Sequence, residues 1–172
     1  MCGFAGYLAG SPGPLSVHAR AVLTAMGDAI RHRGPDDDGQ WWDTAALIGL
    51  AHRRLSIVDL SAAGHQPMHS AHGRYVIAFN GEIYNHLDLR KRLAQEGCDV
   101  AWRGHSDTET LLAGFEAWGI EATICSAVGM FALAVWDRET RLLTLVRDRM
   151  GEKPLYYGLA GKTLLFGSEL KA

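Results

Sequence analysis

Long apolar runs and targeting segments are absent from this sequence. Nowhere do about 18 apolar residues follow one another, the length that a membrane-spanning helix needs. Residues 1–4 carry no basic region ahead of an apolar stretch, so no secretory signal peptide is expected. These absences exclude a helical membrane protein and predict a cytoplasmic one.

A dominant charge and a framework of paired cysteines are also missing. The 17 basic and 19 acidic residues give a formal charge of −2 without a Lys/Arg block, which argues against nucleic acid as a partner. Three cysteines, Cys2, Cys98 and Cys125, are an odd number at wide spacing, so no disulfide framework is expected in a reducing compartment. Cys98 and Cys125 lie near no motif and are interpreted as buried or half-buried packing thiols.

With 172 residues and 48% apolar content, the chain predicts a single domain spanning residues 1–172. Helical spacing covers residues 14–33, 86–96 and a segment from Ser106, and short apolar runs typical of strands cover residues 45–50, 74–79, 130–136 and 141–146. Ser106 and Glu109 have capping-box spacing, which places Asp107 in the first helical turn. The run 130–136 is apolar at every position, so both of its faces should be covered, as in a layered α/β or α+β domain.

Cys2, directly after the initiator Met1, is the first candidate for chemistry. Removal of Met1 would place a thiol and a free α-amine on one residue. An α-amine is partly unprotonated near neutral pH and can take the proton of the thiol, which gives a nucleophile with its own base. Considered alone, Cys2 is more simply the start of a strand.

Three further positions suit acyl transfer on a free amino acid. The Asn80 amide beside the Gly81 N–H offers two donors to a developing oxyanion, although the Asn-Gly dipeptide alone favours a hairpin turn. The Arg54 guanidinium suits a substrate carboxylate, against the default of a solvated surface arginine. Asp107 suits a substrate ammonium, although helix N-termini attract acidic residues in any case.

Taken together, the motifs resemble those of the class II glutamine amidotransferases. The glutaminase domain of glutamine-hydrolysing asparagine synthetases is the most similar branch. The resemblance spans the whole chain through the segments MCGFAG (residues 1–6), RHRGPD (31–36), RLSIVD (54–59), NGEIYN (80–85), GHSD (104–107), GMFA (129–132), RDR (147–149), GEKPLYY (151–157) and SELK (168–171).

The resemblance implies an α+β fold of the N-terminal-nucleophile hydrolase type, a four-layer αββα sandwich of two antiparallel sheets between helical layers. It implies that glutamine is hydrolysed to glutamate and ammonia through a thioester, with Cys2 as nucleophile and Asn80 and Gly81 as oxyanion hole. Arg54 is expected to bind the glutamine carboxylate and Asp107 its ammonium. Further substrate contacts are assigned to Leu55, Ser56, Ile57, Val58 and Glu82.

The resemblance also implies a longer parent chain. We expect a downstream synthetase domain that receives the ammonia, with aspartate as the favoured acceptor. ATP and Mg²⁺ are expected only there, and no cofactor or metal is expected in residues 1–172. The oligomeric state is left undecided, with a homodimer as one option. The alternatives are a catalytically silent module supporting a synthetase domain, whose mark would be loss of Cys2, and an amidase for another amide, which Arg54 and Asp107 oppose.

Other local patterns are given structural interpretations. His65, His69 and His72 lie close together, but Pro67 interrupts a helical presentation and no Cys or carboxylate stands among them, so an exposed loop is preferred to a metal site. Gly161 to Thr163 resembles the end of a phosphate loop but lacks its first glycine, and is interpreted as a hairpin turn. Residues 36–38 are interpreted as an acidic turn.

Overall fold

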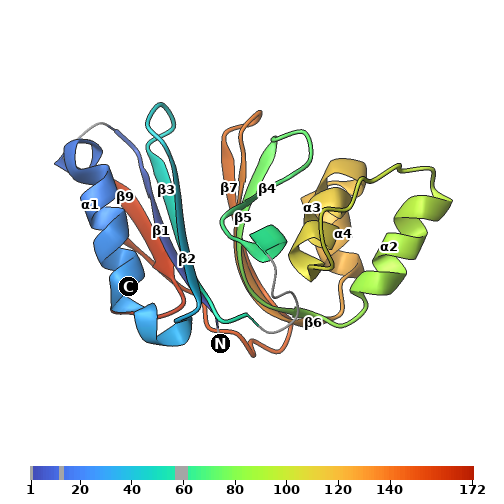
Figure 1. The fold of residues 1–172 in the computed structure, drawn as a ribbon. Coiled ribbons are helices and arrows are strands. Elements are labelled where there is room, and N and C mark those ends of the chain that lie inside the picture. Colours follow the sequence, from blue (N-terminus) through green and yellow to red (C-terminus); the bar gives the residue numbers. More distant parts are fainter. Residues whose placement is uncertain (1, 12–13, 57–61) are drawn as a thin grey trace.

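The computed structural model describes residues 2–11, 14–56 and 62–172. In these ranges two antiparallel sheets lie face to face (Figure 1). The first has the order β2-β3-β1-β9-β8 and the second β4-β5-β6-β7. Their strands are β1 (Gly3–Ala9), β2 (Asp37–Asp43), β3 (Ile48–Arg54), β4 (Met68–His69), β5 (Tyr75–Ile83), β6 (Gly129–Asp137), β7 (Leu142–Arg147), β8 (Tyr156–Ala160) and β9 (Thr163–Gly167).

Helices cover the outer face of each sheet. Figure 1 shows α1 (Pro14–Ala29) against the first sheet, and α3 (Asp107–Trp118) and α4 (Ile120–Ser126) beside the second, with α2 (His86–Gln95) packed on α3. Two short 3-10 helices, η1 (Arg31–Arg33) and η2 (Ala62–Gly64), complete the described elements. The predicted four-layer αββα sandwich is therefore confirmed. None of the helices in the described ranges has the length and apolar content to cross a membrane.

Side chains of β5 and β6 point alternately toward the first sheet and toward the helices, which explains how two sheets and a helical layer stack. Val76 and Ala78 face the first sheet, where Phe4 and Phe166 lie in the same buried cluster. Ile77, on the opposite face of β5, packs in the cluster that holds Leu111 and Phe115 of α3. Because successive strand residues point to opposite faces, a strand between two apolar layers must be apolar at every position. The fully apolar run of β6 had predicted this arrangement, and it is confirmed.

Several predicted boundaries need correction. The first helix ends at Ala29, and the following residues form η1. The strand expected over residues 45–50 begins at Ile48, and residues 44–47 form the turn before it. Residues 36–38 are not an isolated acidic turn, because β2 begins at Asp37 and pairs with β3. No apolar pattern marks β2, because it is an edge strand whose residues are mostly only partly buried.

Two local patterns differ in the structure from what they indicate on their own, and both bear on the site. Asn80 and Gly81 form no hairpin turn, because β5 continues through them and pairs them with Ala132 and Phe131. The capping box at α3 is incomplete. Ser106 caps the helix by accepting from the Thr108 N–H, but the Glu109 carboxylate accepts from the Arg103 and Gly104 N–H groups.

Candidate active site

A cavity of about 130 Å³ opens where the two sheets meet the start of α3. Strand alternation brings its key side chains together. Arg54 lies on the same face of β3 as Leu50, and Asn80 on the same face of β5 as Ala78, both toward the space between the sheets. Cys2 directly precedes β1 and lines the same cavity. Its lining residues are Cys2, Arg54, Leu55, Gly64, Gln66, Phe79, Asn80, Gly81, Glu82, Ser106, Asp107, Thr108, Met130 and Lys153.

The thiol of Cys2 lies against the end of β3. Its Sγ accepts from the Leu55 N–H at 3.3 Å and lies 3.5 Å from the Leu55 carbonyl oxygen. The Cys2 carbonyl oxygen accepts from Arg33 Nε at 3.0 Å, which fixes the main chain at the nucleophile. The thiol is half-buried and lines the cavity, so its sulfur can reach a substrate bound there. Cys98 is half-buried as predicted, whereas Cys125 is exposed, contrary to the prediction, because α4 turns it outward.

Two unused donors reach the cavity from β5. Asn80 is 2% exposed, and its Nδ2 has no hydrogen-bond partner in the described residues. Gly81 pairs with Phe131, whose own N–H and C=O bond to Asp148 on the far side of β6. Gly81 and Phe131 are therefore a pair without mutual hydrogen bonds, and the Gly81 N–H points outward from the edge of β5. A buried donor without a partner costs free energy, which is recovered when a substrate oxygen accepts from it.

The two candidate contacts for the ends of an amino acid are both buried. The Arg54 side chain is held at the cavity wall, and Gly64 leaves room for it, since a Cβ there would lie 2.6 Å from Arg54 Cζ. Asp107 is 6% exposed and accepts from the Ile83 and Thr108 N–H groups, each at 2.8 Å. Burial raises the pKa of the Asp107 carboxyl, and the two backbone donors oppose that rise. A bound ammonium would complete its hydrogen bonding.

The remaining predicted contacts divide into three groups. Leu55 and Glu82 line the cavity. Ser56 does not, and its N–H donates to Asp36 Oδ2 at 2.8 Å. Ile57 and Val58 lie outside the described residues, so their predicted contacts stay predictions.

Sequence reasoning missed several lining residues. Gln66, Thr108 and Lys153 are all buried at the cavity wall. No spacing rule links Gln66 to Asn80, because β4 and a turn separate them and only tertiary pairing brings them together. Lys153 lies in the segment 151–157, which carried the resemblance without a stated role.

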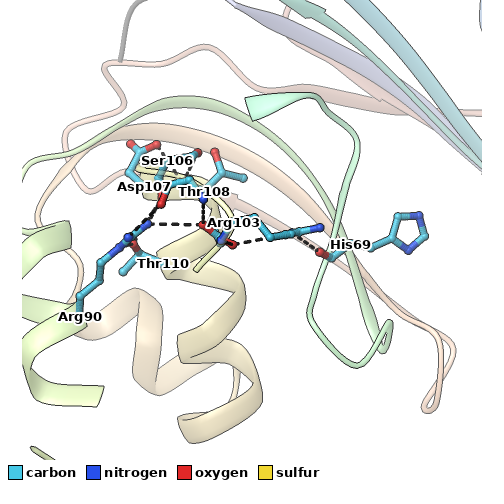
Figure 2. A network of polar contacts seen from close by, with 9 residues as sticks. His69, Arg90, Arg103, Ser106, Asp107, Thr108 and Thr110 are labelled. Atoms are coloured by element: carbon cyan, nitrogen blue, oxygen red, sulfur yellow. Dashed lines mark hydrogen bonds and ion pairs between the residues drawn. The ribbon is translucent and has the colours of Figure 1, made fainter. Parts of the chain in front are cut away.

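The start of α3, which carries Asp107, is held by a polar network that Figure 2 shows in close view. Arg90 donates from Nη2 to the Ser106 carbonyl oxygen at 2.9 Å and from Nε to Thr110 Oγ1 at 2.8 Å. Arg103 donates to the His69 carbonyl oxygen at 3.0 Å. These bonds tie the helix terminus to α2 and β4, so the position of the Asp107 carboxylate is determined by several elements at once.

The three neighbouring histidines do not converge. His65 Nδ1 lies 2.8 Å from Asp37 Oδ2, His72 Nδ1 lies 2.6 Å from Glu116 Oε2, and His69 packs edge-on against Trp41. No group of three His, Cys, Asp or Glu side chains suited to a metal ion occurs in the residues that the structure covers. The segment from Gly161 to Thr163 forms the β8–β9 hairpin, as predicted, with Gly161 at a φ of +62°.

Comparison with known proteins now defines the family. The family described as "Glutamine amidotransferase domain" matches residues 1–172, and the chain belongs to it. Asparagine synthetase [glutamine-hydrolyzing] 3 of Bacillus subtilis is 40% identical over 174 residues, covering 100% of this chain and 27% of the relative. A putative asparagine synthetase [glutamine-hydrolyzing] of Mycobacterium bovis is 40% identical over 182 residues, covering 99% of this chain and 27% of the relative. The chain thus spans about a quarter of the length of these relatives.

A solved structure supports the fold independently. Glutamine phosphoribosylpyrophosphate (PRPP) amidotransferase from B. subtilis, complexed with ADP and GMP, superposes with a TM-score of 0.76. The match covers 97% of this chain and 42% of the other at 18% sequence identity. The layered sandwich is therefore shared with a protein of very different sequence.

Proposed function

We propose that this domain hydrolyses the side-chain amide of glutamine to glutamate and ammonia, with Cys2 as nucleophile. The observation that carries the proposal is the pair of donors on β5, the buried Asn80 amide and the Gly81 N–H, which line one cavity with the Cys2 thiol. Arg54 and Asp107 line the same cavity and supply the opposite charges that a free amino acid presents.

The reaction would proceed in two acyl-transfer steps. After Met1 is removed, the α-amine of Cys2 takes the thiol proton, and the thiolate attacks the side-chain carbonyl carbon of glutamine. The carbonyl electron pair moves to oxygen, where Asn80 and Gly81 donate to the negative charge. Collapse breaks the C–N bond, and the proton held by the amine goes to the leaving ammonia. Water then gives a proton to the Cys2 α-amine and adds to the glutamyl thioester. The C–S bond breaks, the leaving thiolate takes the proton back from the amine, and glutamate is released.

The fate of the ammonia is a second part of the proposal. Ammonia released into water near neutral pH is protonated to unreactive ammonium, so a coupled enzyme needs a shielded route to a second site. The relatives are asparagine synthetases about four times as long as this chain. We therefore propose that the domain supplies a synthetase domain, with aspartate as acceptor and with ATP and Mg²⁺ acting there. Cys2 chemistry itself requires no cofactor.

The test is to incubate purified residues 1–172, freed of Met1, with glutamine and to measure glutamate and ammonia. We expect both products without ATP, no activity in Cys2→Ala, and normal activity in Cys125→Ala, a matched change at an exposed thiol. Added aspartate and ATP should yield no asparagine. A folded, processed fragment without glutaminase activity would favour the silent-module alternative, and asparagine formation would contradict the assignment of synthesis to another domain.

A further inference from the structure

The peptide groups of Phe79, directly before the two oxyanion donors, are held by two side chains from distant parts of the chain. The Phe79 N–H donates to Gln66 Oε1 at 2.7 Å. The Phe79 carbonyl oxygen lies 3.0 Å from His52 Nε2, which must donate because a carbonyl only accepts. Gln66 is 6% and His52 1% exposed, so both bonds are largely shielded from bulk water.

The register of the second sheet explains why side chains are needed there. β4 pairs with β5 only through Met68 with Ile77 and His69 with Val76. If this pairing continued in the same register, residue 66 would lie opposite Phe79. Because β4 begins only at Met68, no strand backbone accepts from the Phe79 N–H, and the Gln66 side chain accepts from it instead. At the next outward positions the Gly81 N–H faces the cavity, and the Ile83 N–H is bonded by Asp107 Oδ2. The Gly81 N–H thus lies between the Phe79 and Ile83 N–H groups, both of which donate to side chains.

Gln66 is itself tied to three layers. Its main-chain oxygen packs on Gly39 of β2, where any Cβ would collide with it. The neighbouring His65 bonds to Asp37 of the same strand at 2.8 Å. Gln66 Nε2 donates to Thr108 Oγ1 of α3 at 3.4 Å. A displacement of Gln66 would therefore have to move an edge strand or the start of α3. The side-chain oxygen Oε1, which accepts from the Phe79 N–H, is held in place for the same reason.

We propose that Gln66, with His52 as the second contact, is a positioning residue that sets the geometry of the Asn80–Gly81 oxyanion hole. The inference rests on the proposed glutaminase function and deepens it. Neither residue is assigned a reacting atom. Misplacement of catalytic donors by about 1 Å can cost about 100-fold in rate. Removing the Gln66 acceptor should therefore lower kcat by about 10- to 100-fold while Arg54 and Asp107 still bind glutamine.

The experiment compares Gln66→Met, which keeps length and loses the acceptor, with Gln95→Met, the same change at an exposed site on α2. We expect kcat of Gln66→Met to fall about 10- to 100-fold. The KM for glutamine and the Kd for glutamate should stay within about threefold, because these depend on the carboxylate and ammonium contacts. Gln95→Met should match the wild type.

Two labelling rates separate positioning from general damage. In alkylation of Cys2 by the diazoketone 6-diazo-5-oxo-L-norleucine, the sulfur displaces N2 from the methylene carbon while the adjacent ketone oxygen would lie in the proposed oxyanion hole, so this reaction should also slow in Gln66→Met. Alkylation by iodoacetamide needs no oxyanion hole and should be unchanged. If Gln66→Met does not fold, His52→Asn, whose amide is too short to reach Phe79, is measured in the same way.

The outcomes are distinct for the two proposals. A wild-type domain without glutaminase activity overturns the proposed function. An active wild type with an unchanged kcat in Gln66→Met overturns the positioning role alone. A parallel loss of kcat, glutamate affinity and iodoacetamide reactivity also overturns it, because it would show a merely structural role.

Discussion

Replacement of Asn80 by alanine isolates one donor of the oxyanion hole. The Asn80 Nδ2 is buried and bonds to nothing in the described residues, so its removal breaks no protein hydrogen bond from that atom. Loss of one oxyanion donor typically raises the barrier by about 2.7 to 4 kcal/mol. We therefore expect kcat for glutamine hydrolysis to fall about 100- to 1000-fold in Asn80→Ala, with KM changed little, because Arg54 and Asp107 are intact.

A matched asparagine provides the control. Asn85 lies five residues further along, donates from Nδ2 to the Ser126 carbonyl oxygen at 3.0 Å and accepts from the Val128 N–H at 2.9 Å. Asn85→Ala removes two structural hydrogen bonds, so its Tm should fall while its kcat stays within a few-fold of the wild type. Steady-state glutamate release and thermal unfolding measure both variants. Asn80→Ala with near-wild-type kcat, or with the same profile as Asn85→Ala, would refute the assignment.

Three other predictions follow from the same geometry. Intact-mass analysis of active protein should show the chain lighter by Met1, since a free α-amine on Cys2 is needed, and full activity with Met1 retained would contradict this. Arg54→Lys should raise KM for glutamine by about 10-fold or more with a smaller effect on kcat, because lysine cannot bind a carboxylate in bidentate fashion; an unchanged KM in steady-state kinetics would count against the carboxylate role. Burial lowers the pKa of His52 from 6.5 to about 4, although its bond to Phe79 opposes that change. The unfolded chain then binds the extra proton first, so the free energy of unfolding should be highest above about pH 6.5 and fall by about 3 kcal/mol as the pH drops toward 4. Denaturant titrations should show that the free energy of unfolding falls less in His52→Asn than in the wild type over that pH range. An equal fall with pH in both proteins would contradict a buried, neutral His52.

The layers of the fold were predictable because apolar periodicity records burial directly. The apolar run of residues 130–136 predicted a strand covered on both faces, and β6 has Ala132 toward one sheet and Leu133 toward the helices. Strand β2 was not predictable in the same way. An edge strand needs no apolar pattern, and its acidic residues pair instead with groups on other segments, such as Arg53 and His65.

The site was predictable where a residue type is tied to a chemical role. Cys2, Arg54, Asn80, Gly81 and Asp107 all line one cavity. Local rules misled at Asn80 and Gly81, because the turn preference of Asn-Gly is weaker than the pairing of β5 with β6. Gln66 was missed because its role arises from strand register, which only the assembled sheet displays.

Covalent trapping of the nucleophile tests the central claim most directly. The processed protein is treated with 6-diazo-5-oxo-L-norleucine, digested and mapped by mass spectrometry. The account predicts one adduct per chain, on Cys2, with loss of glutaminase activity in proportion to labelling and with protection by glutamate. Labelling confined to Cys98 or Cys125, or full labelling of Cys2 with undiminished glutamine hydrolysis, would contradict Cys2 as the nucleophile.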